Sequence, residues 1–95
     1  MTDIENLPAQ IQKAFPNPFE REVQIEFVIG KENCHKAQLH FTDMMGRTVE
    51  VVGVSLSNTG KYIYKWNAAN RPAGIYFATL SVDGIKAHTI KLILK

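Results

Sequence analysis

The residues most capable of chemistry in this 95-residue chain are its single cysteine, Cys34, and the adjacent His35. A thiolate paired with an imidazole is a common nucleophile in enzymes. Successive residues of a strand point to opposite faces of the sheet, however, so adjacency works against contact between these two side chains. Both residues also lie beside a polar turn at 30–33. The pattern therefore favours two ordinary turn residues, and we predict that the chain is not an enzyme.

Metal and cofactor sites are not indicated either. The histidines His35, His40 and His88 lack the spacing of zinc ligands, and no cysteine or carboxylate cluster lies near them in the sequence. The 9 carboxylates are spread singly, whereas a calcium loop needs several oxygen ligands within a few residues. No glycine-rich phosphate-binding loop occurs. We predict no bound metal and no cofactor.

Length and composition restrict the class of protein. A chain of 95 residues suits one domain, and 45% hydrophobic with 21% charged residues predicts a folded one. The net charge of +2 comes from scattered Lys and Arg, which argues against nucleic-acid binding. No apolar run approaches the roughly 20 residues of a membrane span, and no signal peptide opens the chain. Alone, this composition is typical of a cytoplasmic protein, although an excised domain with an added Met1 would look the same.

Apolar residues alternate with polar ones in several short runs, as they do in half-buried strands. The strands are expected at 23–29, 36–42, 47–54, 62–66, 75–82 and 85–94. Their expected inward residues are Val23, Ile25, Phe27, Ile29, Ala37, Leu39, Phe41, Val49, Val51, Tyr76, Ala78, Leu80, Val82, Ile90, Leu92 and Leu94. Turn signals separate them, including a hairpin turn at 43–46 and a type I′ turn at Asp83-Gly84. About seven short strands without a helix predict an all-β antiparallel sandwich or small barrel.

Two further segments complete the expected organisation. Residues 1–14 contain Pro8 and are interpreted as a linker, with at most a short strand or one helical turn. Pro16 and Pro18 restrict the backbone on either side of Asn17 and predict a stiff corner, whose flanking Phe15 and Phe19 pack at the core edge.

Tyr62, Tyr64 and Trp66 recur at every second position and therefore share one face of a strand. Such a row could stack against sugars, which makes a carbohydrate-binding module one hypothesis. The stronger interpretation is that a small sandwich needs these large side chains to fill its core.

Five short motifs, taken in order, resemble one known family, the type A C-terminal sorting domains of the type IX secretion (Por) system. They are Phe15-Pro16-Asn17-Pro18-Phe19, Leu39 to Val49 with its Asp43-Met44-Met45-Gly46-Arg47 turn, Gly60-Lys61-Tyr62 with Trp66-Asn67, Pro72-Ala73-Gly74-Ile75-Tyr76-Phe77, and Asp83-Gly84 followed by Thr89 to Lys95. The resemblance covers residues 15–95. It departs at Phe15, where Tyr is commoner, and at Ile90, where a second lysine is common. An Ig-like module of flagellar hook-capping proteins shares the Trp and Gly-x-Tyr blocks and is the alternative within the fold.

This resemblance implies an Ig-like β-sandwich that is a non-catalytic secretion signal. It implies that the chain is a fragment, that a separately exported cargo domain precedes it, and that shuttle and translocon proteins carry the cargo from the periplasm across the outer membrane. A sortase-like cysteine protease would then cut within residues 1–14, leaving the cargo at the cell surface or outside the cell.

The expected roles of single residues follow from the motifs and their positions. We expect Arg47, Lys91 and Lys95 to contact partner carboxylates, the alternative being ordinary solvated cations. Structural roles are expected for Pro16, Asn17, Pro18, Asp43, Gly46, Gly74, Tyr76, Asp83 and Gly84. The edge of the last strand is expected to be open, so that a partner strand or a second copy of the chain can add to it.

Overall fold

A computed structural model describes residues 9–30, 35–56 and 59–95, and these residues form strands but no helix. The strands are β1 (Ala9–Phe15), β2 (Glu22–Ile29), β3 (Lys36–Asp43), β4 (Thr48–Ser55), β5 (Gly60–Asn67), β6 (Gly74–Val82) and β7 (Ile85–Leu94). Cys34, and with it the suggested cysteine–histidine pair, lies outside the described residues, as does Asn58 of the turn before β5. No helix long and apolar enough to cross a membrane occurs in the described ranges.

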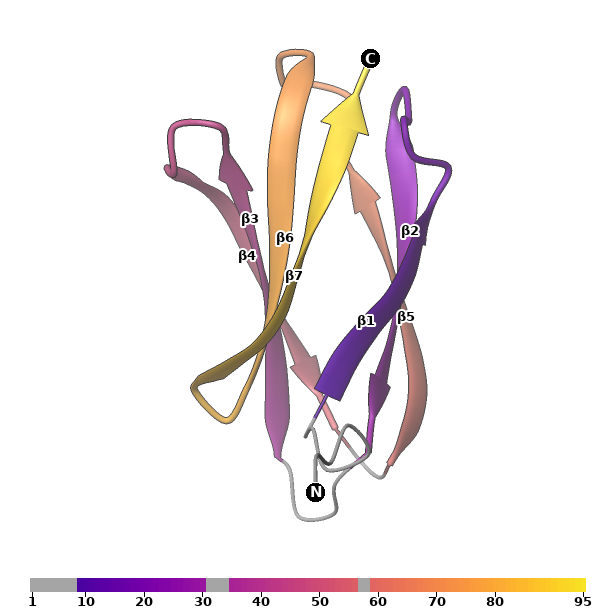
Figure 1. The fold of residues 1–95 in the computed structure, drawn as a ribbon, viewed down its shortest axis with the longest axis vertical. Coiled ribbons are helices and arrows are strands. Elements are labelled where there is room, and N and C mark those ends of the chain that lie inside the picture. Colours follow the sequence, from indigo (N-terminus) through magenta and orange to yellow (C-terminus); the bar gives the residue numbers. More distant parts are fainter. Residues whose placement is uncertain (1–8, 31–34, 57–58) are drawn as a thin grey trace, which may run out of the picture.

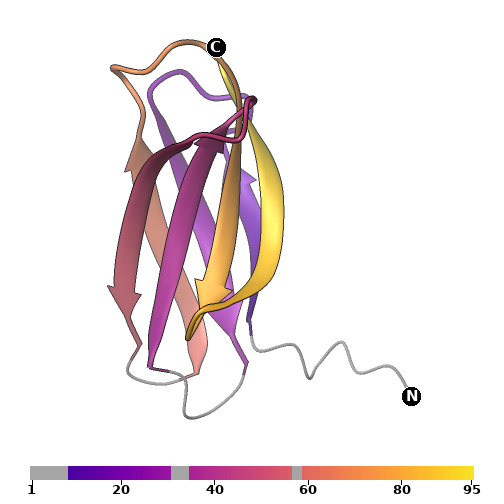
Figure 2. The same ribbon diagram turned by 90° about the vertical axis from the view of Figure 1, so that its left-hand side faces the viewer.

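The strands form two antiparallel sheets that pack face to face (Figures 1 and 2). One sheet has the order β1-β2-β5 and the other the order β4-β3-β6-β7. This arrangement confirms the predicted all-β sandwich. The sheets enclose one core, because each strand turns alternate side chains toward the opposite sheet.

The core contains the residues that alternation had placed inward. In β2, Val23, Ile25 and Phe27 are fully buried, and in β3 the same holds for Ala37, Leu39 and Phe41. The largest fully buried side chain belongs to Trp66 of β5. Strand β6 contributes Tyr76, Ala78, Leu80 and Val82, and β7 contributes Leu92 and Leu94.

Strand β4 departs from the expected alternation. Val51 was expected to face inward, but 46% of its surface is exposed. The reason is a bulge, because Thr42 pairs with Thr48 whereas Phe41 pairs with Glu50, which leaves Val49 as an extra residue. Beyond this bulge the parity of the strand changes, so Val52 and Val54 pack against the core instead.

The segment expected to be a linker is partly a strand of the sandwich. Strand β1 pairs with β2 from Ala9↔Ile29 to Phe15↔Gln24. Ala9 and Ile11 are each 2% exposed, since they cover the edge of the core beside β2. The prediction of a linker over 1–14 was therefore wrong from Ala9 onward, and the folded unit includes β1.

A candidate recognition site at one end of the sandwich

Motifs that are far apart in sequence meet at one end of the molecule. The connection after β1, the turn between β3 and β4, the loop before β6 and the end of β7 all lie at the end drawn uppermost in Figure 1. This end therefore carries Asn17, Asp43, Arg47, Gly74 and Lys95. The Asp83-Gly84 turn and Gly60 at the start of β5 lie at the opposite end, so the structure separates them from these residues.

The side chain of Asn17 takes the place of a neighbouring strand beside β7. Its Nδ2 donates to the carbonyl oxygen of Lys91 at 2.9 Å, and its Oδ1 accepts from the backbone N–H of Ile93 at 3.0 Å. The backbone of Phe19 continues this pairing, since its N–H donates to Ile93 and its carbonyl accepts from Lys95, both at 2.8 Å. A short parallel bridge between Phe19 and Leu94 results.

This pairing corrects the expectation of an open terminal edge. Between Lys91 and Lys95, the outward backbone groups of β7 bind Asn17 and Phe19, so a partner strand would first have to displace the Pro16–Pro18 corner. The premise for a dimer through this edge is therefore wrong over these residues. Within the corner Phe19 is 1% exposed, as expected, but Phe15 is 39% exposed and does not enter the core.

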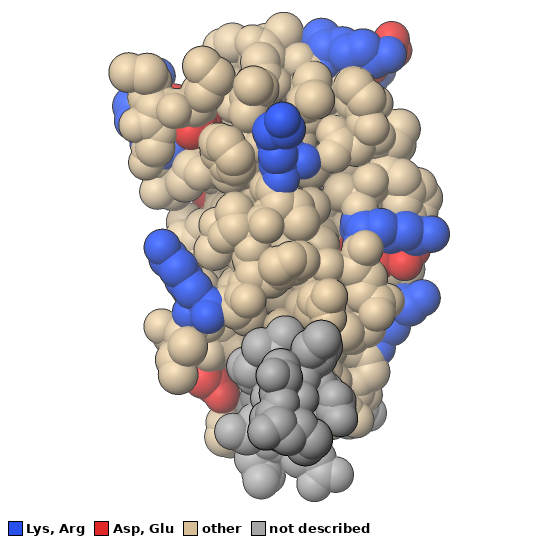
Figure 3. Space-filling view, in the orientation of Figure 1, with Lys and Arg blue, Asp and Glu red and all other residues tan. Residues whose placement is uncertain are grey.

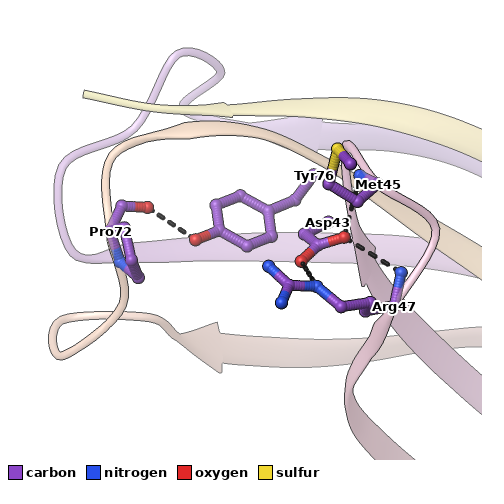
Figure 4. A network of polar contacts seen from close by, with 5 residues as sticks. All are labelled: Asp43, Met45, Arg47, Pro72 and Tyr76. Atoms are coloured by element: carbon purple, nitrogen blue, oxygen red, sulfur yellow. Dashed lines mark hydrogen bonds and ion pairs between the residues drawn. The ribbon is translucent and has the colours of Figure 1, made fainter.

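Asp43 organises the turn that presents Arg47. Its Oδ1 accepts from the backbone N–H groups of Met45 and Arg47, and its Oδ2 accepts from Nε of Arg47, each at 2.9 Å (Figure 4). The backbone bond from Arg47, followed by its guanidinium and by the N–H of Met45, lowers the pKa of the Asp43 carboxyl. Gly46 has a φ of +85°, which confirms its predicted role in the turn. The Arg47 side chain remains 78% exposed.

Tyr76 fixes the loop that precedes β6. Its ring is buried against Trp66. Its hydroxyl donates to the carbonyl of Pro72 at 2.5 Å (Figure 4), which resembles the tyrosine corner of Ig-like sandwiches. Gly74 between them has a φ of +150°. An open hollow of about 390 Å³ lies here, lined by Asp43, Arg47, Thr48, Val49, Arg71, Pro72 and Tyr76.

Glu50 and Arg71 form a polar link that the sequence did not indicate. Nε1 of the buried Trp66 donates to Oε1 of Glu50 at 2.8 Å, and the Arg71 guanidinium donates to the same oxygen at 3.2 Å and to the carbonyl of Val49 at 2.9 Å. A buried indole N–H requires a hydrogen-bond acceptor. This requirement of Trp66 is the one feature of the sequence that could have indicated the link. The pKa of the nearby Tyr64 is raised, mainly by burial and to a smaller extent by the charge of Glu50.

The aromatic row of β5 faces the core. Trp66 is fully buried and stacks on Phe41 at 4.1 Å between ring centroids, while Tyr62 stacks on Phe27 at 5.6 Å. Tyr62 and Tyr64 are half-buried and pack against the core. The row therefore fills the sandwich and offers no flat platform for sugars.

Asp83 joins its hairpin to the start of β3. Asp83 and Gly84 have φ values of 50° and 86°, which confirms the predicted two-residue turn. The Asp83 carboxylate accepts from the backbone N–H groups of Lys36 and His35, at 3.0 and 3.1 Å, and these two bonds lower its pKa. The described residues contain no group of three or more potential metal ligands.

Comparisons with known proteins agree with the fold. No curated relative matches the chain. Among solved structures, dimeric latent PorU from Porphyromonas gingivalis aligns with a TM-score of 0.77 at 18% identity, over 90% of this chain and 9% of PorU. A hypothetical protein, PH1083 from Pyrococcus horikoshii OT3, aligns with a TM-score of 0.50 at 14% identity, over 92% of this chain and 85% of the PH1083 chain. These structures share the fold. The family described as "secretion system C-terminal sorting domain" matches residues 13–95, and the chain therefore belongs to it.

Proposed function

We propose that this domain directs an N-terminally attached cargo protein through the type IX outer-membrane translocon, and that shuttle and translocon proteins contact the end of the sandwich described above. One observation carries the proposal. Asn17 binds the terminal strand, so the first and last motifs of the family pattern form a single ordered surface. Arg47, Lys91 and Lys95 project from this surface as exposed cations, and each can pair with a carboxylate of the partner.

We also propose where the cargo is released. A sortase-like cysteine protease would cut on the N-terminal side of Ala9, because a protease needs accessible, extended chain and β1 is paired from Ala9 onward. The cargo would then remain at the cell surface or leave the cell, while the sorting domain separates as a folded unit. The domain itself takes no part in the chemistry of cleavage.

Secretion of a reporter tests the first proposal. A reporter with an export signal, fused in front of residues 1–95, should leave a cell that has type IX secretion. Combined Arg47→Ala, Lys91→Ala and Lys95→Ala substitutions should leave it in the periplasm. Removing the last five residues is a poorer test, because it also takes Leu92 and Leu94 from the core.

Lysines of the other sheet provide the matched control. Lys13→Ala with Lys65→Ala removes exposed positive charge from β1 and β5 and should leave secretion unchanged. Retention of the wild-type fusion in the periplasm would refute the sorting function. Secretion of the triple variant at the wild-type level would instead refute the role of the three cations.

A further inference from the structure

The outer face of the four-stranded sheet has an unusual composition. Outward positions alternate with buried ones along β3, β4, β6 and β7. Among the described residues, the outward side chains within 38–42, 51–55, 75–79 and 89–93 include no carboxylate. The outward positions in the half of the sheet nearer the end of β7 are Thr42, Ile75, Phe77, Thr79, Lys91 and Ile93. Lys91 is the one charged residue among these six.

The strand register brings these residues together. Phe77 lies between Thr42 of β3 and Lys91 of β7, and Ile75 lies opposite Ile93. Directly paired residues on one face of an antiparallel sheet have Cβ atoms about 5 Å apart. Ile75, Phe77 and Ile93, each half-buried, therefore form a continuous apolar patch next to the exposed Lys91. In the row below, Thr79 and Thr89 bind each other through their hydroxyls at 2.9 Å.

The outer face of the three-stranded sheet provides a comparison within the same molecule. It carries Glu22, Lys61 and Lys65 together with the largely buried Glu26, whose carboxylate lies 3.6 Å from Nζ of Lys61. This face also has an exposed apolar side chain, Ile63, but charges of both signs surround it, as is typical of a solvated surface. The outer face of β4-β3-β6-β7 is the one turned toward the viewer in Figure 2. Figure 3 shows the adjoining edge of the sandwich, where β7 and β1 lie in front, and the basic side chains there stand apart from one another.

We propose that the outer face of β4-β3-β6-β7 is a docking surface for a protein of the secretion machinery, one that presents apolar side chains around a carboxylate placed against Lys91. This inference rests on the proposed sorting function and extends the partner's contact from the end of the sandwich, through Lys91, onto this face. An aromatic residue surrounded by apolar and hydroxyl groups is a common anchor of protein interfaces. Because the face has no carboxylate of its own, a partner's acidic group can approach Lys91 without repulsion.

Two pairs of matched substitutions test the docking surface. Phe77→Thr removes the anchor and Lys91→Glu reverses the charge, whereas Ile63→Thr and Lys65→Glu make the same changes on the other sheet. Threonine retains strand propensity, and Lys91→Glu alters only an exposed side chain, so at least this variant should keep its fold. The thermal midpoint of each purified domain checks this point.

We expect each of the first two variants to reduce the secreted fraction of the reporter by about tenfold or more, the effect of losing an interface anchor. The two control variants should match the wild type. Folded Phe77→Thr and Lys91→Glu variants that are secreted normally would overturn the docking surface while leaving the sorting function intact. A wild-type fusion that stays in the periplasm would overturn the sorting function and the proposed partner with it.

A second copy of the chain is the competing occupant of this face. Sedimentation of the wild-type domain at micromolar concentration should show a monomer. A dimer that dissociates in Phe77→Thr but persists in Ile63→Thr would assign the face to self-association and overturn the proposal.

Discussion

At the scale of single residues, carboxylates and one amide fix the backbone at points where the strands end. Asp43 holds the turn before β4, Asp83 ties its hairpin to β3, and Asn17 binds the edge of β7. Each side chain supplies backbone hydrogen bonds that the sheets do not make at those positions. The exposed Arg47 therefore lies on an ordered turn, which would reduce the conformational entropy lost in the proposed contact with a partner.

Both aspartates connect stability to pH. The backbone N–H of Arg47 holds the pKa of the Asp43 carboxyl below its ordinary value of 3.8. The backbone N–H groups of Lys36 and His35 do the same for the pKa of Asp83. A carboxyl whose pKa is lower in the folded than in the unfolded chain stabilises the fold above its unfolded pKa, and this contribution is lost as the pH falls through the folded value. The domain should therefore lose stability below about pH 4.

The substitution Asp43→Asn isolates one of these contributions. The amide oxygen of the introduced asparagine could still accept the backbone bonds of the turn but would carry no charge, so the variant should be less stable at pH 7 and lose less on acidification. Urea midpoints at pH 7 and pH 3 measure the difference. An equal acid-induced shift in Asp43→Asn and the wild type would contradict the assignment.

At the scale of elements, the terminal strand depends on the Asn17 side chain. In Asn17→Ala the N–H of Ile93 loses its acceptor, so its amide hydrogen should exchange with solvent roughly tenfold faster or more, corresponding to a local loss of about 1.4 kcal/mol. Leu92, whose register partner is Tyr76 of β6, provides the internal control and should change little. Hydrogen exchange followed by NMR resolves the two amides. Equal acceleration at both positions would mean that the whole strand has loosened.

The burial of residues along the strands shows how much of the fold the sequence could predict. Period-two alternation placed the inward residues of β2, β3 and β6 correctly, because burial on one sheet face imposes that period. A bulge such as that at Val49 changes the parity without any local signal, so Val51 was misplaced. The contacts of Asn17 and Glu50 join residues that are far apart in sequence, and no periodic pattern contains that information.

At the scale of the whole molecule, β1 decides where the sorting domain begins. Its Ala9 and Ile11 complete the core beside β2, and the N–H of Ile11 donates to Nδ1 of His88 in β7 at 3.0 Å, which links the two sheets along one side. Cleavage after β1 would leave this side of the core exposed and β2 as an unprotected edge. The boundary therefore matters for folding, and it limits where the proposed cleavage can fall.

Two lengths of the domain test this boundary. A version that starts at Pro16 should be less stable than one that starts at Ala9 by at least about 3 kcal/mol, because it loses a fully buried isoleucine side chain together with the backbone pairing of a strand. Urea unfolding measures this difference, and sedimentation should show self-association of the shorter version through the uncovered β2 edge. Equal stability of the two versions would place β1 outside the folded unit and would move the limit of the proposed cleavage region to Phe15.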